Sequence, residues 1–301
     1  MAADSRQRFA GSQVIAIIAV AVLAVVVVVL AVLALGHAKG EGTSGEAAPV
    51  PTFDLGVQSA SPTPTETPIP EFDRANERFL AQGAGTLWRA TAGECGETEP
   101  LVERSDDRGD SWVDVTPLYK GIGQVASLDP FADVQAEMVA SMTDECETQA
   151  LRTFTQGLYW ESYPDVLAAS RYIDPADPAT VVLAGDEVDA PCDVAHGLRA
   201  SGDTVALLCE AEAYVFDDGE WMPLPGAGAV ALAVYSGTVA VAHSADDCDG
   251  VAVTQFTGAD AGSAIEIGCA EGADATSPAA LVATGSASYL LWSGDELFVV
   301  G

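Results

Sequence analysis

The stretch Ser105-Asp106-Asp107-Arg108-Gly109-Asp110-Ser111-Trp112 decides the fold of this chain. Its pattern, Ser-x-Asp-x-Gly-x-x-Trp, has the spacing of a tight β-hairpin turn. Asp107 can accept hydrogen bonds from the amides of the turn, Gly109 can adopt a backbone conformation that other residues resist, and Trp112 can pack beneath the turn. Because a hairpin accounts for every residue of the stretch, the pattern predicts β-structure rather than chemistry.

The same pattern recurs downstream, which indicates an internal repeat. Residues 86–112 align with residues 136–160: in both, an apolar strand leads to an acidic residue and a cysteine, a second strand follows, and a turn delivers a tryptophan. The second copy keeps the spacing of the turn, with threonine in place of the aspartate: Thr153, Thr155, Gly157 and Trp160. Further copies are shorter or truncated and cover residues 204–221, 238–258 and 288–301.

The region from residue 71 to residue 301 predicts an all-β domain. Short apolar runs are separated by Gly, Asp, Ser and Pro, and no segment keeps helical periodicity over three turns. A repeat of about 40–50 residues is typical of a β-propeller. We expect about five blades, and the irregular insertion at 165–189 leaves room for a sixth. The last unit supplies only three strands, so we expect residues 78–82 to complete it and close the ring.

On these residues the domain resembles the Asp-box (BNR) repeat β-propeller superfamily, which includes sialidase-like enzymes, sortilin-like receptor ectodomains and photosystem assembly factors. The motif is intact once, degenerate once and eroded in the other repeats, so the resemblance covers the blades and is specific around residues 105–112. It implies structural roles in one hairpin for Ser105, Asp107, Gly109 and Trp112.

The N-terminal part of the chain predicts a membrane anchor. Residues 14–35 are 22 consecutive apolar residues, enough for a helix to cross a hydrocarbon core of roughly 30 Å. Arg6 and Arg8 precede this run, so the positive-inside rule places residues 1–13 in the cytoplasm and the C-terminal domain outside it. A cleaved signal peptide is the alternative, but the apolar run is longer than the usual one. We therefore expect an uncleaved signal-anchor in the cell membrane.

Residues 36–70 predict a linker between the anchor and the extracytoplasmic domain at 71–301. The sequence SASPTPTETPIP at residues 59–70 favours an extended polyproline conformation and cannot bury a core. We expect it to act as a stalk, either bare or carrying O-linked sugars on its threonines.

The six cysteines all lie beyond the predicted span, and an even number in an oxidising compartment indicates disulfides. Four of them form two pairs placed symmetrically about predicted hairpin turns, and each pair is expected to staple the open end of its hairpin: Cys192 with Cys209, and Cys248 with Cys269. Cys95 and Cys146 then pair by elimination. The close Cys-x-x-Cys or Cys/His spacing of a zinc site is absent from the sequence.

The formal net charge is −33, which repels nucleic acids and anionic lipid surfaces, so we expect no nucleic-acid partner. Acidic runs at 174–177, 217–219 and 246–250 lack the alternation of a calcium loop and are better explained as solvated turns. We expect no metal and no cofactor. Scarce lysine and asparagine, beside abundant alanine, valine and glycine, are typical of a GC-rich bacterial genome such as that of an actinobacterium.

The sequence favours binding over catalysis. A sialidase-like reaction needs several arginines that converge on a carboxylate, a tyrosine with a glutamate beside it, and an acidic general acid/base. Where sialidases usually have Arg-Ile-Pro, this chain has Pro68-Ile69-Pro70, and no arginine follows Arg199. His196 and His243 lack a Ser/His/Asp or Cys/His partner pattern.

One segment departs from the repeat and mixes aromatic residues, proline and arginine, as an irregular binding loop would. Its candidate ligand residues are Tyr159, Trp160, Tyr163, Arg171 and Tyr172. We predict a non-enzymatic docking module for an envelope protein or glycan. The alternatives are a sialidase-like glycoside hydrolase or other carbohydrate-directed enzyme, and a passive spacer.

Overall fold

The computed structural model describes residues 72–132 and 134–301. All of these residues belong to the compact unit Thr67–Gly301. The predicted cytoplasmic segment, membrane span and linker lie outside the described residues. Within the described ranges, no helix is long and apolar enough to cross a membrane.

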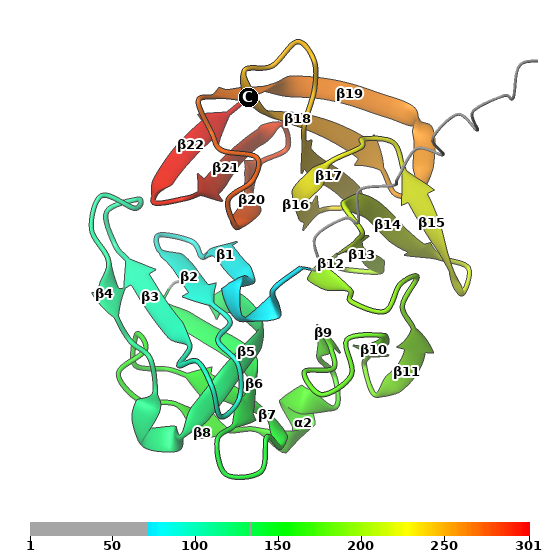
Figure 1. Ribbon diagram of the computed structural model, residues 1–301. Coiled ribbons are helices and arrows are strands. Elements are labelled where there is room, and N and C mark those ends of the chain that lie inside the picture. The colour runs from blue at the N-terminus through cyan, green and yellow to red at the C-terminus, as the bar shows by residue number, and fades with distance from the viewer. Residues whose placement is uncertain (1–71, 133) are drawn as a thin grey trace, which may run out of the picture. The chain divides into compact units, whose positions relative to one another are not determined.

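Six antiparallel sheets form the blades of a ring, which makes the domain a six-bladed β-propeller (Figure 1). Blade 1 contains β1 (Arg78–Gln82), β2 (Leu87–Thr91), β3 (Leu101–Ser105) and β4 (Val113–Asp114), and blade 2 contains β5 (Ile122–Ala132), β6 (Gln135–Met142), β7 (Thr148–Thr153) and β8 (Glu161–Ser162). Blade 3 contains β9 (Arg171–Ile173), β10 (Thr180–Leu183) and β11 (Asp186–Asp189), and blade 4 contains β12 (His196–Ser201), β13 (Thr204–Cys209), β14 (Glu212–Asp217) and β15 (Glu220–Leu224). Blade 5 contains β16 (Ala229–Tyr235), β17 (Thr238–His243), β18 (Gly250–Thr257) and β19 (Asp260–Glu271), and blade 6 contains β20 (Ala279–Gly285), β21 (Ser288–Ser293) and β22 (Glu296–Val300).

The sixth blade comes from the segment predicted as an insertion, so the expectation of five blades is wrong and the alternative of six is confirmed. Blade 3 has three strands, and β9 lies innermost. The short helix α2 (Pro164–Leu167) precedes β9 where the other blades have a first strand, and its Val166 packs against blade 2. A proline at the first helical position favours this helical turn over a strand.

The expected strand exchange at the ring closure is also wrong. Strand β1 pairs along its whole length with β2 and is the first strand of blade 1. Blades 6 and 1 instead meet through side chains, because Leu80 and Leu87 pack with Trp292. The Arg78 guanidinium stacks over the Trp292 ring at 4.1 Å and donates a hydrogen bond to the Gly294 carbonyl at 2.5 Å. A guanidinium over an indole face makes a favourable cation–π contact, which helps to hold blades 6 and 1 together at this partly buried interface.

The core follows the alternation of each strand, and its largest cluster joins blades 1 and 2. Trp88 and Trp160 are both fully buried there, with ring centroids 6.1 Å apart in a T-shaped arrangement. Alanines fill much of the remaining core, which lets neighbouring blades approach closely.

Antiparallel connectivity gives the ring two distinct faces. We call the face where β1 and β12 begin the strap face, because residues 72–77 lie there, and the face where these strands end the open face. The strap contains the 3-10 helix η1 (Arg74–Asn76). In Figure 1 it runs from β1 across the middle of the ring toward β12.

Three disulfides join the six cysteines in the predicted pairs, Cys95–Cys146, Cys192–Cys209 and Cys248–Cys269. Each cysteine lies in or beside a connection on the strap face, as the strand directions require. The first bridge links the β2–β3 connection of blade 1 to the β6–β7 connection of blade 2. The covalent cross-links are therefore confined to one face of the ring.

Candidate functional site

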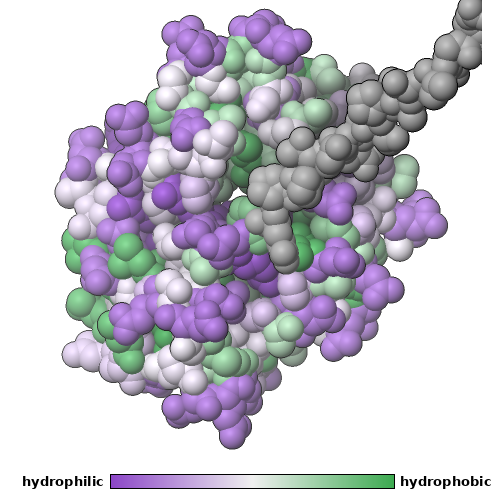
Figure 2. Space-filling model, in the orientation of Figure 1, coloured by the Kyte–Doolittle hydropathy of each residue, from purple (hydrophilic) through white to green (hydrophobic). Residues whose placement is uncertain are grey.

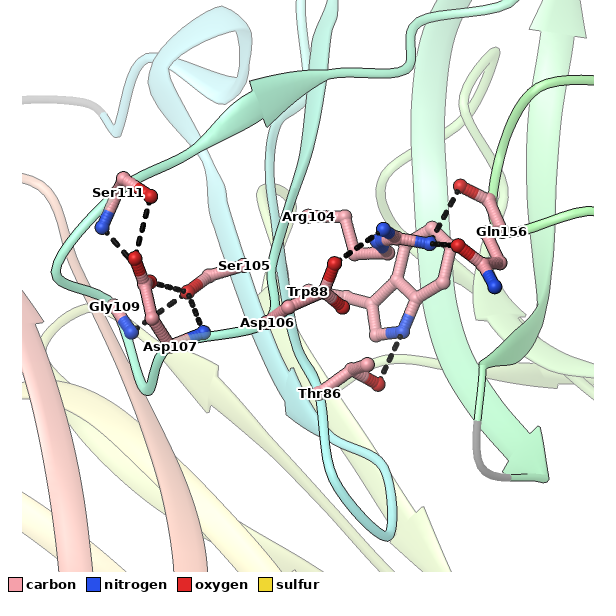
Figure 3. A network of polar contacts seen from close by, with 9 residues as sticks. All are labelled: Thr86, Trp88, Arg104, Ser105, Asp106, Asp107, Gly109, Ser111 and Gln156. Carbon is pink, nitrogen blue, oxygen red and sulfur yellow. Dashed lines mark hydrogen bonds and ion pairs between the residues drawn. The ribbon is translucent and has the colours of Figure 1, made fainter.

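The turn at residues 105–112 is held by its own side chains (Figure 3). The Ser105 hydroxyl accepts a hydrogen bond from the Gly109 amide at 2.8 Å, and the Asp107 carboxylate accepts one from the Ser111 amide at 2.9 Å. Hydrogen bonds from the Ser111 hydroxyl and amide and from Ser105 lower the pKa of Asp107 to about 2. Gly109 has φ +97°, a conformation that favours glycine. The carboxylate is thus occupied by the turn itself.

The second copy of the turn has the same geometry with hydroxyls in place of the carboxylate. The Thr153 hydroxyl accepts from the Gly157 amide at 2.9 Å, and the Thr155 hydroxyl accepts from the Tyr159 amide at 2.8 Å. Arg104 connects the two turns, because it donates to the Gln156 side-chain oxygen at 2.8 Å (Figure 3). Both turns act as hairpin connections, and neither gathers groups for chemistry.

The predicted binding loop does not form one exposed surface. Trp160 is fully buried and donates its indole N–H to the Gly157 carbonyl at 3.0 Å, and Tyr172 is buried in β9. Only Tyr159 is strongly exposed, whereas Tyr163 packs against the core beside α2. Arg171 donates to the Gly202 carbonyl at 2.7 Å. Trp160, Tyr163 and Tyr172 thus belong to the packing of the blades, whereas Tyr159 lies at the surface.

A central channel opens on the open face and forms a cavity of about 510 Å³. First strands of five blades line it, and the residues are mostly small or apolar, among them Leu80, Leu128, Val234 and Val282. Within the described part of the chain, Asp129 and Arg199 are the charged residues of this lining. The volume lies in the range of natural ligand sites.

A second pocket of about 200 Å³ adjoins the channel between blades 2, 3 and 4. It shares Asp129 and Arg199 with the channel and adds Glu137 and Arg171. Asp129 and Arg199 therefore line both cavities, and they are the charged groups that a ligand in either cavity would meet.

Asp129 lies in β5, directly opposite Glu137 in the β5–β6 register. Asp129 is solvent-exposed at the wall of the channel. Restricted hydration of the carboxylate raises the pKa of Asp129 to about 6; Arg199 opposes this shift and Glu137 adds to it. Glu137 differs because Arg152 holds it, with Arg152 Nε 2.7 Å from the carboxylate oxygen.

Arg199 is held by backbone rather than by the neighbouring carboxylate. Its guanidinium donates to the Leu198 carbonyl at 2.7 Å and to the Arg78 carbonyl at 2.8 Å, and it lies 5.0 Å from the centre of the Phe79 ring. Burial lowers the pKa of Arg199, while Glu77 and Asp129 act in the opposite direction. A guanidinium committed in this way is a fixed charge with little freedom to follow a ligand.

The strap closes the other end of the channel. Phe72 stacks on His196 with centroids 3.7 Å apart, and buried Glu77 accepts from the Gly197 amide at 2.8 Å. Burial lowers the pKa of His196, so its ring is neutral at pH 7. Arg74 adds a hydrogen bond to the Asp174 carbonyl of blade 3 at 3.2 Å.

The arginines do not converge as a sialidase-like site requires. Arg89 pairs with Glu103 and Arg152 with Glu137, while Arg78 and Arg104 make the closure and turn contacts above. Among the described residues, the two cavities share only Arg199, and no group of three or more His, Cys, Asp or Glu residues is placed to hold a metal ion.

No family model matches the chain, and no curated protein matches it. Solved structures do match. YCF48 bound to D1 peptide is 12% identical, with 73% of this chain and 76% of that chain covered and a TM-score of 0.41. The SapL1 lectin in complex with alpha methyl fucoside is 8% identical, with 75% and 91% covered and a TM-score of 0.43. The GH43_1 enzyme from Xanthomonas citri is 11% identical, with 75% and 86% covered and a TM-score of 0.36.

Sequence reasoning missed Asp129 as a site residue. A signal was present, because Asp129 is the one charged residue in the strand sequence of residues 122–132 and is followed by Pro130. A single acid in a first strand of a blade is a candidate for the lining of the central channel.

Proposed function

We propose that this chain is a non-enzymatic binding module whose ligand enters the central channel from the open face. The cavity of about 510 Å³, lined by the first strands of five blades, is the observation that carries this proposal. Its small apolar side chains leave room for a ligand, and its two charged residues supply orientation without a reactive constellation.

We further propose that the module is an Asp-box propeller anchored outside the cytoplasmic membrane. The two self-bonded turns support the Asp-box relationship, and three disulfides support an oxidising compartment. The apolar run at 14–35 supports the anchor. Fractionation of cells followed by protease treatment of intact protoplasts tests this: membrane-bound protein with a protease-sensitive C-terminal domain is expected, and a protected domain would contradict it.

A channel-filling variant tests the binding proposal. Ala200 lines both cavities, so Ala200→Trp should occupy the space where they meet. Ala264→Trp is the matched control, because Ala264 is exposed on the outer strand β19. Full-length proteins are immobilised, and the envelope components that each retains are identified by mass spectrometry. Retention that Ala200→Trp abolishes and Ala264→Trp preserves is expected; equal retention by both variants would place binding elsewhere.

A second candidate function is glycan hydrolysis, favoured by one observation. Asp129 and Glu137 are directly opposed carboxylates, and a pKa of about 6 suits Asp129 to donate a proton. Glu137 is bound by Arg152, which makes it a poor base or nucleophile. Release of sugar fragments from envelope glycans by the full-length protein, and its loss in Asp129→Asn, would favour this candidate over binding.

A further inference from the structure

Asp129 stands apart from the other charged groups around the cavities. Glu137 is bound by Arg152, and Arg199 is held by two backbone carbonyls. Within residues 72–132 and 134–301, no hydrogen bond or ion pair reaches the Asp129 carboxylate. Arg199 acts on this carboxylate only through space, so an incoming cation could form the direct ion pair that it lacks.

The walls around this carboxylate are suited to an aliphatic chain. Leu80, Leu128, Val234 and Val282 contribute apolar surface to the channel, and Tyr235 lies at its mouth on the open face. A flexible ligand can lay methylene groups on such walls while its charged end reaches a polar group.

The overall charge of the protein also favours a cationic ligand. The formal net charge of −33 gives a negative potential, which is focused by a low-dielectric channel. Figure 2 shows the strap side of the ring, where hydrophilic residues are spread over the visible surface. Arg152 is paired with Glu137, whereas Arg199 is bound to backbone carbonyls and lies in the field of both Glu77 and Asp129.

We propose that the channel binds an aliphatic ammonium group, with Asp129 as its counter-ion and the apolar channel wall as the surface for its methylene chain. This inference rests on the proposed binding function and names its ligand chemistry. The group can come from a lysine side chain of a partner protein or from a free aliphatic amine. An ammonium on a flexible four-carbon stem fits a single carboxylate at the end of an apolar passage.

The test measures binding of defined probes to the full-length protein in detergent by calorimetry. The probes are 1,5-diaminopentane and the peptide acetyl-Gly-Lys-Gly-amide, with the same peptide acetylated on the lysine amine as the uncharged control. We expect an ammonium probe to bind, the acetylated peptide to bind at least tenfold more weakly, and Asp129→Asn to weaken the ammonium probe at least tenfold. Asp186→Asn makes the same charge change on an exposed outer strand and should leave binding unaltered.

The outcomes separate this inference from the proposed function. Binding of the peptide alone assigns the ammonium to a partner protein, and comparable binding of the diamine assigns it to a small amine. Probe binding that survives Asp129→Asn, or no binding of either probe at millimolar concentration, overturns the inference. The binding function would still stand in that case if Ala200→Trp abolished retention of an envelope component.

Discussion

The two faces of the ring differ in how completely their polar groups are used. On the strap face, three disulfides, the Phe72–His196 stack and the Glu77 hydrogen bond tie loops and blades together. On the open face, the channel leads to Asp129, which has no ion pair among the described residues. The strap face therefore supplies the rigidity, and the open face holds the group that is left for a ligand.

The largest expected effect concerns the disulfides of the strap face. Replacing both cysteines of Cys95–Cys146 with alanine should lower the free energy of unfolding by about 4 kcal/mol, because a separation of 51 residues makes a long loop. The pair Cys192–Cys209, separated by 17 residues, should cost about 3 kcal/mol. Urea unfolding measures both, and an equal or reversed order would contradict the loop-entropy explanation.

The next effect tests the strap itself. Glu77→Ala should lower the free energy of unfolding by about 2–3 kcal/mol, because it leaves the part-buried Gly197 amide and the Arg74 guanidinium without their acidic partner. Glu77→Gln keeps an oxygen for the amide and should cost less. The same urea titration compares the two variants; equal losses would mean that the charge of Glu77 is unimportant.

The third prediction concerns pH and the open face, and it rests on the ammonium proposal. With a pKa of about 6, Asp129 is mostly ionised at pH 7 and mostly protonated at pH 5, so ammonium affinity should fall roughly tenfold between them. The charged groups facing it are Glu137 from β6, Arg171 from β9 and Arg199 from β12. Calorimetry at the two pH values checks this, and Asp129→Asn should show weak binding at both.

The two faces also differ in how far the sequence predicts them. Two of the cysteine pairs and the turn at 105–112 depend on local spacing, and the sequence predicts them; the third pair, Cys95–Cys146, follows by elimination. The sixth blade was only an alternative, because α2 stands where a first strand would be and hides the repeat. The channel could not be predicted, since Asp129 and Arg199 meet only when strands 70 residues apart in the chain come together in the ring. Trp160 was assigned to a ligand although its repeat position fits the core equally well.

The smallest predicted change in the free energy of unfolding is that of Asp129→Asn on the open face. It separates the two faces most clearly, because its sign is opposite to that of the changes predicted for the strap face. A pKa raised to about 6 means that the folded protein binds the Asp129 proton more tightly than the unfolded chain does. The stability from this group is present below its unfolded pKa and is lost as the pH rises through about 6. Asparagine cannot ionise, so the Asp129→Asn variant does not lose stability as the pH rises. At pH 7 its free energy of unfolding should be higher by roughly 1 kcal/mol, allowing for water in the channel.

The gain from Asp129→Asn should shrink at pH 4, where the native carboxyl is protonated in the folded protein. Urea unfolding at the two pH values measures it, with Asp186→Asn as the control for removing a negative charge from an already acidic surface. Destabilisation by Asp129→Asn at pH 7 would show that the carboxylate has a structural partner. A gain in stability together with a loss of ammonium binding would show that the carboxylate is kept at the expense of stability because the open face uses it.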